Sequence, residues 1–526
     1  MLNRFIIRSR QKKYSQLTGD IVTPSDNSTT LLSKDLNENL AAIKNIFVNT
    51  DDLIIREFKI GRELQVNAFA VMIVGLINEV SVNENLIRPL MSLDLDICKE
   101  STLKVIKESA LFVASIHETQ KLDNTVSGIL SGDTALFIDG TDSALIASFR
   151  GWEARRVDEP KTEAVVRGPR EGFVESLSTN IALLRRKIKN PQLKFEKMTV
   201  GNQTRTDICI AYINNIANAK TVQEVKDRVS RIETDSILES GYIEEFIEDA
   251  PYSLFPTVGN SEKPDIIAAK LLEGRIAVLT DGTPFVLTVP YLFIEAFQNS
   301  EDYYARPYLS TFIRWLRWWA FIISVFLPAL YVAITTFHQE LLPTSLLISV
   351  ASSHEGIPFP TILEAVLMQI AFEILREAGL RMPKAVGQAV SIVGALVIGE
   401  AAVSAGLVGS PMVVVMALTG ISSFVVPTLT DVTTVTRFIL LLLAGFAGLY
   451  GVILGFVGII THQLSLRSFG QPYLSPLAPL NVSDLKDVII RAPWWAMNTR
   501  PSSLSNNSTR QKNSSIPHPP EKKHDN

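Results

Sequence analysis

The stretch from Thr361 to Ala378, TILEAVLMQIAFEILREA, is largely apolar yet carries ionisable side chains at helical spacing. On a helix that turns about 100° per residue, four of its polar side chains share one stripe near the C-terminal end: Gln369, Glu373, Arg376 and Glu377. A charge that faces hydrocarbon costs at least ~2.5–3.5 kcal/mol even on insertion scales. The stripe must therefore face water, a protein partner or a lumen.

Three interpretations of this helix stay open: an amphipathic helix at the membrane interface, a helix that packs on partners inside a bundle, and a pore-lining helix of an oligomer. The third makes eight residues candidates for a pore or gate. The apolar ones fit packing equally well. The eight are Leu363, Glu364, Val366, Leu367, Ile370, Glu373, Arg376 and Glu377.

A second ionisable group, Glu400, stands alone inside the apolar segment Val386–Gly409. An ionisable residue at the middle of a membrane span is a functional-site candidate by default. Arg376 and Arg381 are its candidate partners. Like the polar stripe, Glu400 must face water, a protein partner or a lumen.

A polar, charge-dense connector runs from Gly151 to Gly172, GWEARRVDEPKTEAVVRGPREG. Such a run is typical of ion pairs that dock two subdomains or protomers, and a phosphate or partner site is the alternative. The candidate assembly residues are Arg155, Arg156, Glu159, Glu163, Arg167 and Arg170.

The remaining residue types indicate no enzyme. Residues 35–310 hold a single histidine, His117, which we expect on a helix at the surface or core edge. Neither G-x-x-x-x-G-K-[ST] nor G-x-G-x-x-G after a strand is present. Two cysteines exclude a disulfide scaffold and a Cys-based zinc finger. We predict no catalytic site, no metal site and no cofactor.

Composition sets apart two kinds of protein in one chain. The 526 residues carry 50 Lys+Arg against 54 Asp+Glu, a balance that argues against nucleic acid as the main partner. Between Trp315 and Gln463, however, only 5 Lys/Arg and 7 Asp/Glu occur in 149 residues. That stretch is the part of the chain suited to a bilayer.

The first part alternates short apolar runs, turns and helical patterns, which predicts two α/β subdomains. A strong hairpin signal is Asp281-Gly282 between apolar runs. The expected organisation is a basic, poorly ordered arm (1–34), cytoplasmic subdomains (35–150 and 151–310), a transmembrane domain (311–465), a membrane-proximal segment (466–499) and a disordered tail (500–526).

The second part predicts an all-α bundle of about 4–5 hydrophobic segments. Trp315–Phe337 supplies 23 residues with one charge, and a span needs about 20. Small residues in the other segments favour packing against protein rather than lipid. Arg314 and Arg317 precede the first span while Thr335 to Pro360 lacks Lys and Arg, which places the N-terminal half in the cytoplasm.

Five long stretches resemble the A subunit of spore germinant receptors, the GerA family of endospore-forming bacteria. They lie in the family's order and span most of residues 35–495: Arg156–Ile188, Asp281–Phe293, Glu301–Tyr308, Phe372–Pro383 and Gln471–Leu480. Stretches of this length are far more specific than a short catalytic motif.

The resemblance implies a multi-pass protein of the spore inner membrane that acts with a B subunit resembling amino-acid permeases and a lipoprotein C subunit. Nutrient binding to such a complex triggers ion release and germination. The resemblance also implies a homo-oligomer, expected to be a pentamer, that forms a nutrient-gated ion channel. A non-conducting scaffold and a stand-alone secondary transporter are the alternatives; the transporter would need inverted repeats, and none is evident.

Overall fold

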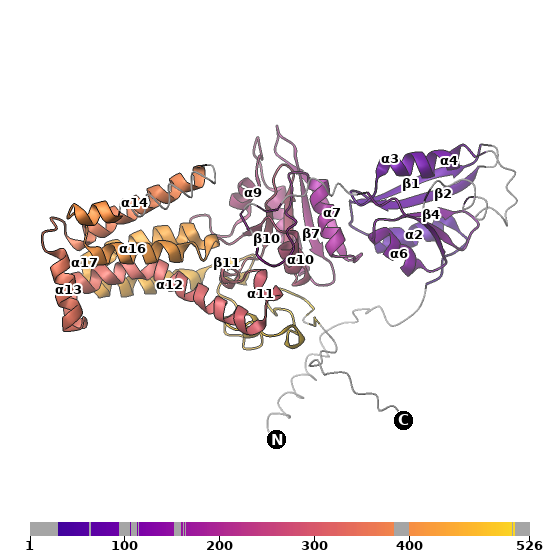
Figure 1. The fold of residues 1–526 in the computed structure, drawn as a ribbon. Helices are drawn as coiled ribbons and strands as arrows, with labels where there is room; N and C mark the ends of the chain where they lie inside the picture. The colour runs from indigo at the N-terminus through magenta and orange to yellow at the C-terminus, as the bar shows by residue number, and fades with distance from the viewer. Residues whose placement is uncertain are drawn as a thin grey trace, which may run out of the picture. The chain divides into compact units, whose positions relative to one another are not determined.

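The computed structural model describes residues 30–62, 65–93, 106, 113, 115–151, 159–160, 162–163, 165–382, 399–507 and 509–510. They form two compact units, divided near residue 152. The first unit is α/β, and the second joins another α/β subdomain to a helical half (Figure 1).

The first unit is built on an antiparallel sheet in the order β1-β2-β4-β5-β3. Figure 1 shows α3 and α4 on one face of this sheet and α2 and α6 on the other. The elements are α2 (Leu36–Ile46), β1 (Leu53–Ile60), β2 (Val66–Ile73), α3 (Glu79–Val82), a π-helical turn (Asn83–Ile87), α4 (Arg88–Met91), β3 (Ile116–Thr119), α6 (Leu122–Leu130), β4 (Thr134–Ile138) and β5 (Ala144–Ala147).

His117 corrects one expectation. It lies on edge strand β3, not on a helix, and faces Ile146 of β5 in the antiparallel register. Four residues, with the two central ones exposed, are enough to close the sheet edge, and tertiary pairing decides their conformation.

The second α/β subdomain has a sheet in the order β6-β7-β9-β10-β8. The predicted Asp281-Gly282 hairpin is confirmed, because β9 and β10 pair antiparallel on either side of it. The elements are α7 (Leu177–Lys187), β6 (Leu193–Val200), β7 (Thr206–Ile213), α8 (Ala219–Ser230), α9 (Ser240–Ile247), β8 (Gly259–Ser261), α10 (Pro264–Leu272), β9 (Ile276–Thr280) and β10 (Val286–Val289).

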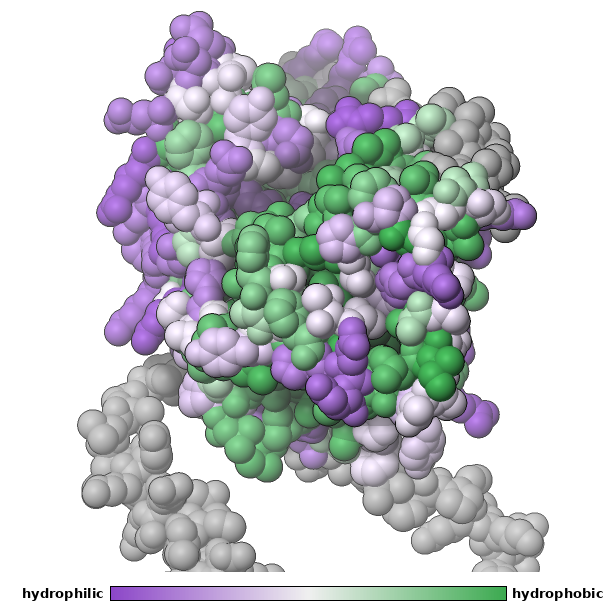
Figure 2. Space-filling view, turned by 90° about the vertical axis from the view of Figure 1, so that its left-hand side faces the viewer, coloured by the Kyte–Doolittle hydropathy of each residue, from purple (hydrophilic) through white to green (hydrophobic). Residues whose placement is uncertain are grey.

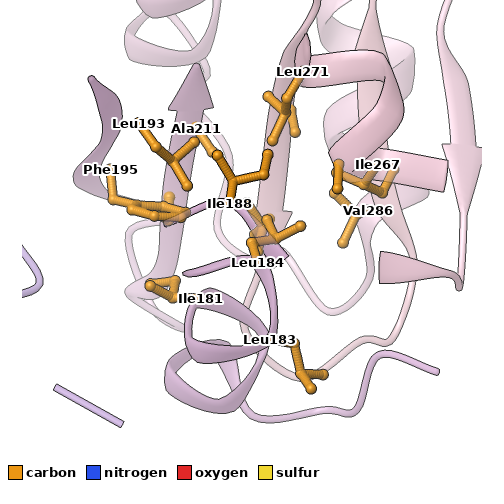
Figure 3. Packing of buried hydrophobic residues seen from close by; sticks show 14 of the residues in the cluster. Ile181, Leu183, Leu184, Ile188, Leu193, Phe195, Ala211, Ile267, Leu271 and Val286 are labelled. Carbon is orange, nitrogen blue, oxygen red and sulfur yellow. The ribbon is translucent and has the colours of Figure 1, made fainter. Parts of the chain in front are cut away.

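Strand β7 explains why this sheet is buried on both faces. Its odd residues, such as Cys209 and Ala211, join the core beneath α7 and α10, where Figure 3 shows Leu184 and Leu271 converging. Its even residues, such as Ile210, join a second core that includes residues of α8 and α9. Side chains on a strand alternate between faces, so two covered faces require a continuous apolar run.

The two sheets share one topology, since each places its strands in the relative order 1-2-4-5-3. Each also follows its second strand with the same turn and helix start, at residues 74–80 and 214–220. The hydrophobic pattern is retained while the residues differ, which is why the duplication is not evident as a sequence repeat.

The helical half contains five longer helices and short 3-10 turns among the described residues. Among them, two helices are long and apolar enough to cross a bilayer, Pro307–Phe337 and Pro427–Ser465. The helices are α11 (Glu301–Tyr304), α12 (Pro307–Phe337), α13 (Thr344–His354), α14 (Thr361–Arg381), α16 (Ser410–Ser423) and α17 (Thr430–Ser465). Figure 2 looks onto this end, where hydrophobic side chains cover much of the face.

Glycines let α14 approach its neighbours closely. A Cβ at Gly445 of α17 would overlap Ile362 of α14, and a Cβ at Gly420 of α16 would overlap Phe372. Within α17, Gly448 adopts φ 59°, a conformation that interrupts the helix and that side chains disfavour. Small residues here therefore serve protein–protein packing, in line with the expectation for this half.

The segment after α17 folds back onto the second subdomain. It includes β11 (Arg467–Ser468), β12 (Gln471–Pro472) and 3-10 turns at Leu485–Asp487 and Trp494–Ala496. Leu504 is buried, and the Asn506 N–H donates to the carbonyl of Ile216 at 3.0 Å. Residues 500–507, 509 and 510 thus pack against the protein, which corrects the disorder expected from their polar composition.

Candidate functional site: a buried ionic cluster on a two-faced helix

A buried ionic cluster joins α14 to α17. Glu373 Oε2 lies 2.8 Å from a terminal nitrogen of Arg376, and its Oε1 lies 3.6 Å from Nη1 of Arg437. The Gln369 amide donates to Glu373 Oε1 at 2.8 Å, and the Thr434 hydroxyl donates to the same oxygen at 3.3 Å. Three members of the predicted polar stripe therefore face protein in the single chain.

Arg437 is the most enclosed member of this cluster. Its residue exposure is 0 %, and its Nε donates to the carbonyl of Ser324 at 2.6 Å. Both terminal nitrogens lack a hydrogen-bond acceptor among the described residues. Two guanidinium groups thus share one carboxylate, so the cluster carries a net positive charge in an apolar bundle.

A second polar cluster lies at the other end of α14. Glu364 is fully buried; its Oε1 lies 3.2 Å from Nδ1 of His354, and its Oε2 accepts the Gly409 N–H at 2.9 Å. The Tyr331 hydroxyl lies 3.3 Å from the other His354 ring nitrogen. Glu364 therefore holds α13, α14 and the start of α16 together.

The opposite face of α14 is apolar and exposed. Leu363, Leu367, Ile370 and Ile374 recur every three to four residues and are 40–63 % exposed. Glu377 extends this face toward the C-terminal end and pairs with Arg381 at 2.6 Å, both side chains being mostly exposed. Val366, by contrast, packs at the edge of the helical core.

Glu400 is exposed on a helical piece at residues 399–404. Its two candidate partners pair elsewhere, Arg376 with Glu373 and Arg381 with Glu377. Both arginines find a carboxylate one turn away on their own helix, and a pairing with Glu400 stays a prediction.

The connector shows three separate environments. Glu163 accepts from the Ser261 hydroxyl at 2.6 Å and from the Glu262 N–H, and burial raises the pKa of its carboxyl. Arg170 pairs with Glu159 at 3.1 Å on the surface. Arg167 is exposed, and its backbone N–H donates to Glu301 Oε1 at 3.2 Å. Arg155 and Arg156 lie outside the described residues.

A further ionic node lies where α12 begins. Asp302 bridges Arg314 at 3.1 Å and Arg317 at 2.8 Å, and Arg314 also reaches Asp487 Oδ1 at 3.1 Å. Asp302 and Arg314 are almost completely buried. Burial raises the pKa of the Asp487 carboxyl, and the neighbouring Arg314 opposes that shift.

The sequence interpretation did not single out Arg437, His354, Asp302 or Asp487. Arg437 precedes the long apolar run of the last span, and α17 begins two turns before it, at Thr430. A charge inside a helix of span length is a recognisable signal once that start is known. For Asp487 no local signal exists, since its partner Arg314 lies 173 residues away along the chain, and Asp302 lies 12 and 15 residues before its partners Arg314 and Arg317.

No group of three His, Cys, Asp or Glu side chains that could hold a metal occurs within the described ranges. Two cavities there are lined by residues of the second subdomain and the C-terminal segment, and both include the ion pair Glu273–Arg275. The architecture defines a class: a two-part protein with a tandem α/β half and an apolar helical half that contains buried charges.

Comparison with known proteins narrows this class. The family model described as Bacillus/Clostridium GerA spore germination protein matches residues 41–503. The chain belongs to this GerA family, as the five stretches indicated. It is 48% identical over 477 residues to spore germination protein KA of Bacillus subtilis (strain 168), covering 90% of this chain and 88% of that protein.

Two further relatives and one solved structure are also similar to this chain. Spore germination protein GerLA of Bacillus cereus is 36% identical over 475 residues, covering 90% of this chain and 96% of that protein. A membrane protein of Bacillus subtilis (strain 168), YfkQ, is 44% identical over 482 residues, covering 91% and 93%. The crystal structure of the N-terminal domain of the A subunit of the Bacillus megaterium germinant receptor GerK3 matches with 37% identity and a TM-score of 0.41, over 51% of this chain and 99% of that domain.

Proposed function

We propose that this chain is the A subunit of a nutrient germinant receptor in the spore inner membrane. It acts with a permease-like B subunit and a lipoprotein C subunit, and it converts nutrient sensing into ion release. The N-terminal α/β half lies in the cytoplasm, and four or five segments of the helical half enter the membrane. Family membership over residues 41–503 supports this assignment.

In this proposal several copies, five by resemblance to the family, surround an ion path lined by α14. The main support for this proposal is that α14 has one charged side and one apolar side. Its charged side is held by Arg437 of the same chain, whereas its apolar side, Leu363, Leu367 and Ile370, is exposed. Copies that meet around an axis would close this apolar side into a constriction, and hydrophobic constrictions gate by excluding water.

The length of α14 supports the same arrangement. Its 21 residues extend ~32 Å, close to the ~30 Å of a hydrocarbon core. Glu377 lies near one end of the exposed side, where a ring of carboxylates would attract cations. Glu364 and Arg376 then position the helix rather than line the path.

The test is to weaken the apolar constriction without changing the fold. Spores with Leu367→Ser should release monovalent cations before any nutrient is added. Ile453→Ser is the matched control, because Ile453 of α17 is also exposed and apolar. If both variants are silent at normal protein levels, the ion path does not run along this side of α14.

One observation favours a second candidate, a non-conducting scaffold of the receptor. Gln369, Glu373 and Arg376 find their partners within the chain, as expected of a structural helix. Purified full-length chain in a planar bilayer separates the two: a scaffold gives no conductance, whereas the channel gives conductance that Leu367→Ser increases.

A further inference from the structure

The first half of α12 carries an aromatic stripe that the protein leaves uncovered. Tyr308, Phe312, Trp315 and Trp319 recur at intervals of four, three and four residues, which places them on one helix face. Their exposed fractions are 88, 57, 48 and 62 %. Large apolar patches that stay exposed mark surfaces of interaction.

Most of this stripe lies outside the hydrocarbon core. The 31 residues of α12 extend ~46 Å, about 16 Å more than a ~30 Å core. Arg314 and Arg317 on the other side of the helix are engaged with Asp302, so the ionic node marks the polar end. The excess length therefore falls on the turns that carry Tyr308 and Phe312.

A second segment, far away in sequence, widens the same surface. The Trp315 indole N–H donates to the carbonyl of Ile489 at 3.1 Å, and the Arg491 N–H donates to the Thr311 hydroxyl at 3.2 Å. Residues 489–491 thus run along α12. Ile489 and Ile490 are exposed, at 44 and 55 %.

We propose that these five residues, Tyr308, Phe312, Trp315, Ile489 and Ile490, form a juxtamembrane foot that docks on the lipid headgroup zone. Three observations select lipid rather than a protein partner. The stripe reaches the span through its last member, Trp319, and continues there into exposed Ile322. Its aromatic members suit the boundary between headgroups and acyl chains, where tyrosine and tryptophan are enriched. Arg306, exposed at its outer end, is placed for a lipid phosphate.

The foot is fastened to the soluble half by the ionic node. Arg314, on the inner side of the same helix turns, binds Asp302 before α12 and Asp487 before the second segment. Gln298 adds a hydrogen bond to the Asp487 carbonyl at 2.7 Å. The headgroup contact thereby fixes where the second α/β subdomain sits above the membrane.

Tryptophan quenching tests this contact, because the chain has only six tryptophans and two of them, Trp318 and Trp319, provide references. The full chain, with all six replaced by Phe, is placed in nanodiscs of phosphatidylcholine and phosphatidylglycerol. Single tryptophans are then introduced as Ile490→Trp or Tyr308→Trp. Lipids brominated near the headgroup end of the acyl chain serve as quenchers.

Two references come from the same helix. A chain that keeps only Trp319 reports the lipid-facing span, and one that keeps only Trp318, stacked on Phe297 at 3.8 Å, reports the protein interior. Ile490→Trp and Tyr308→Trp should each be quenched at least half as strongly as Trp319. If quenching at both positions stays at the Trp318 level, the foot does not contact lipid and the proposal is overturned. The proposal is also overturned if the two positions become shielded from the quencher only when copies of the chain associate, because the surface is then covered by protein.

Discussion

Arg437 of α17 lies 3.6 Å from Glu373 of α14, and within the described part of the chain the only other ion pair of either residue is Glu373–Arg376. The contact joins the helix that carries the candidate path to one of the two candidate spans. Because two guanidinium groups share one carboxylate, Glu373 is the residue on which this junction depends.

Replacing that carboxylate should destabilise the helical half. Glu373→Gln leaves the buried Arg437 and the half-buried Arg376 without a counter-charge, which costs about 3–5 kcal/mol. Thermal unfolding of the detergent-solubilised chain measures the loss. Glu377→Gln is the matched control, since its exposed pair with Arg381 contributes ~0–1 kcal/mol.

The double variant Glu373→Gln/Arg437→Met should be more stable than Glu373→Gln alone, because removing Arg437 relieves an unpaired charge. Strict additivity of the two single changes would mean that the residues do not interact in the membrane.

Glu377→Gln should leave stability unchanged but reduce cation conductance of the reconstituted receptor. A ring of carboxylates concentrates cations, so the loss is roughly tenfold at low salt and smaller at high salt because of screening. Single-channel recording at two salt concentrations measures it. An equal effect at both concentrations would point to a change in structure instead.

The soluble half should become less stable as pH rises from about 5 to about 7, because Glu244 loses its proton over this range. Burial, together with neighbouring Glu248, raises the pKa of Glu244 from 4.5 to about 7. In that window the folded protein keeps a proton that the unfolded chain has released, so folding is favoured at the lower pH.

The Glu244→Gln variant should lose this pH-dependent part of the free energy of unfolding, which is worth roughly 1–2 kcal/mol after allowance for solvent access. Thermal midpoints of the full chain at both pH values measure the difference. Exposed Glu233→Gln serves as the control, and an identical pH slope in Glu244→Gln and wild type would show that Glu244 is not responsible.

Reversing the exposed Arg167 to Glu should lower the size of the assembled complex. Its backbone is held by Glu301, so the side chain projects from a fixed loop and is suited to contact another protomer. Size-exclusion chromatography with light scattering reports the change. Arg231→Glu, also exposed but outside the connector and the helical half, should leave assembly intact.

Local patterns were sufficient for much of the fold. The Asp281-Gly282 hairpin and the β6 and β7 strands follow from turn chemistry and alternation, and α14 follows from a helical period bounded by Pro360. Edge strand β3 was missed because four residues carry little periodicity. The shared topology of the two sheets was missed because it resides in strand order.

The sequence by itself determined that an apolar helix with a polar stripe exists and that its charges require shelter. Periodicity and composition are properties of neighbouring residues, so they can be read along one segment. Only the tertiary structure decided that Glu373 meets Arg437, that Glu364 meets His354, and that Leu367 is left exposed. Those outcomes depend on which helix packs on which side, and that choice is made by the fit of Gly445 and Gly420 against α14 rather than by any local pattern.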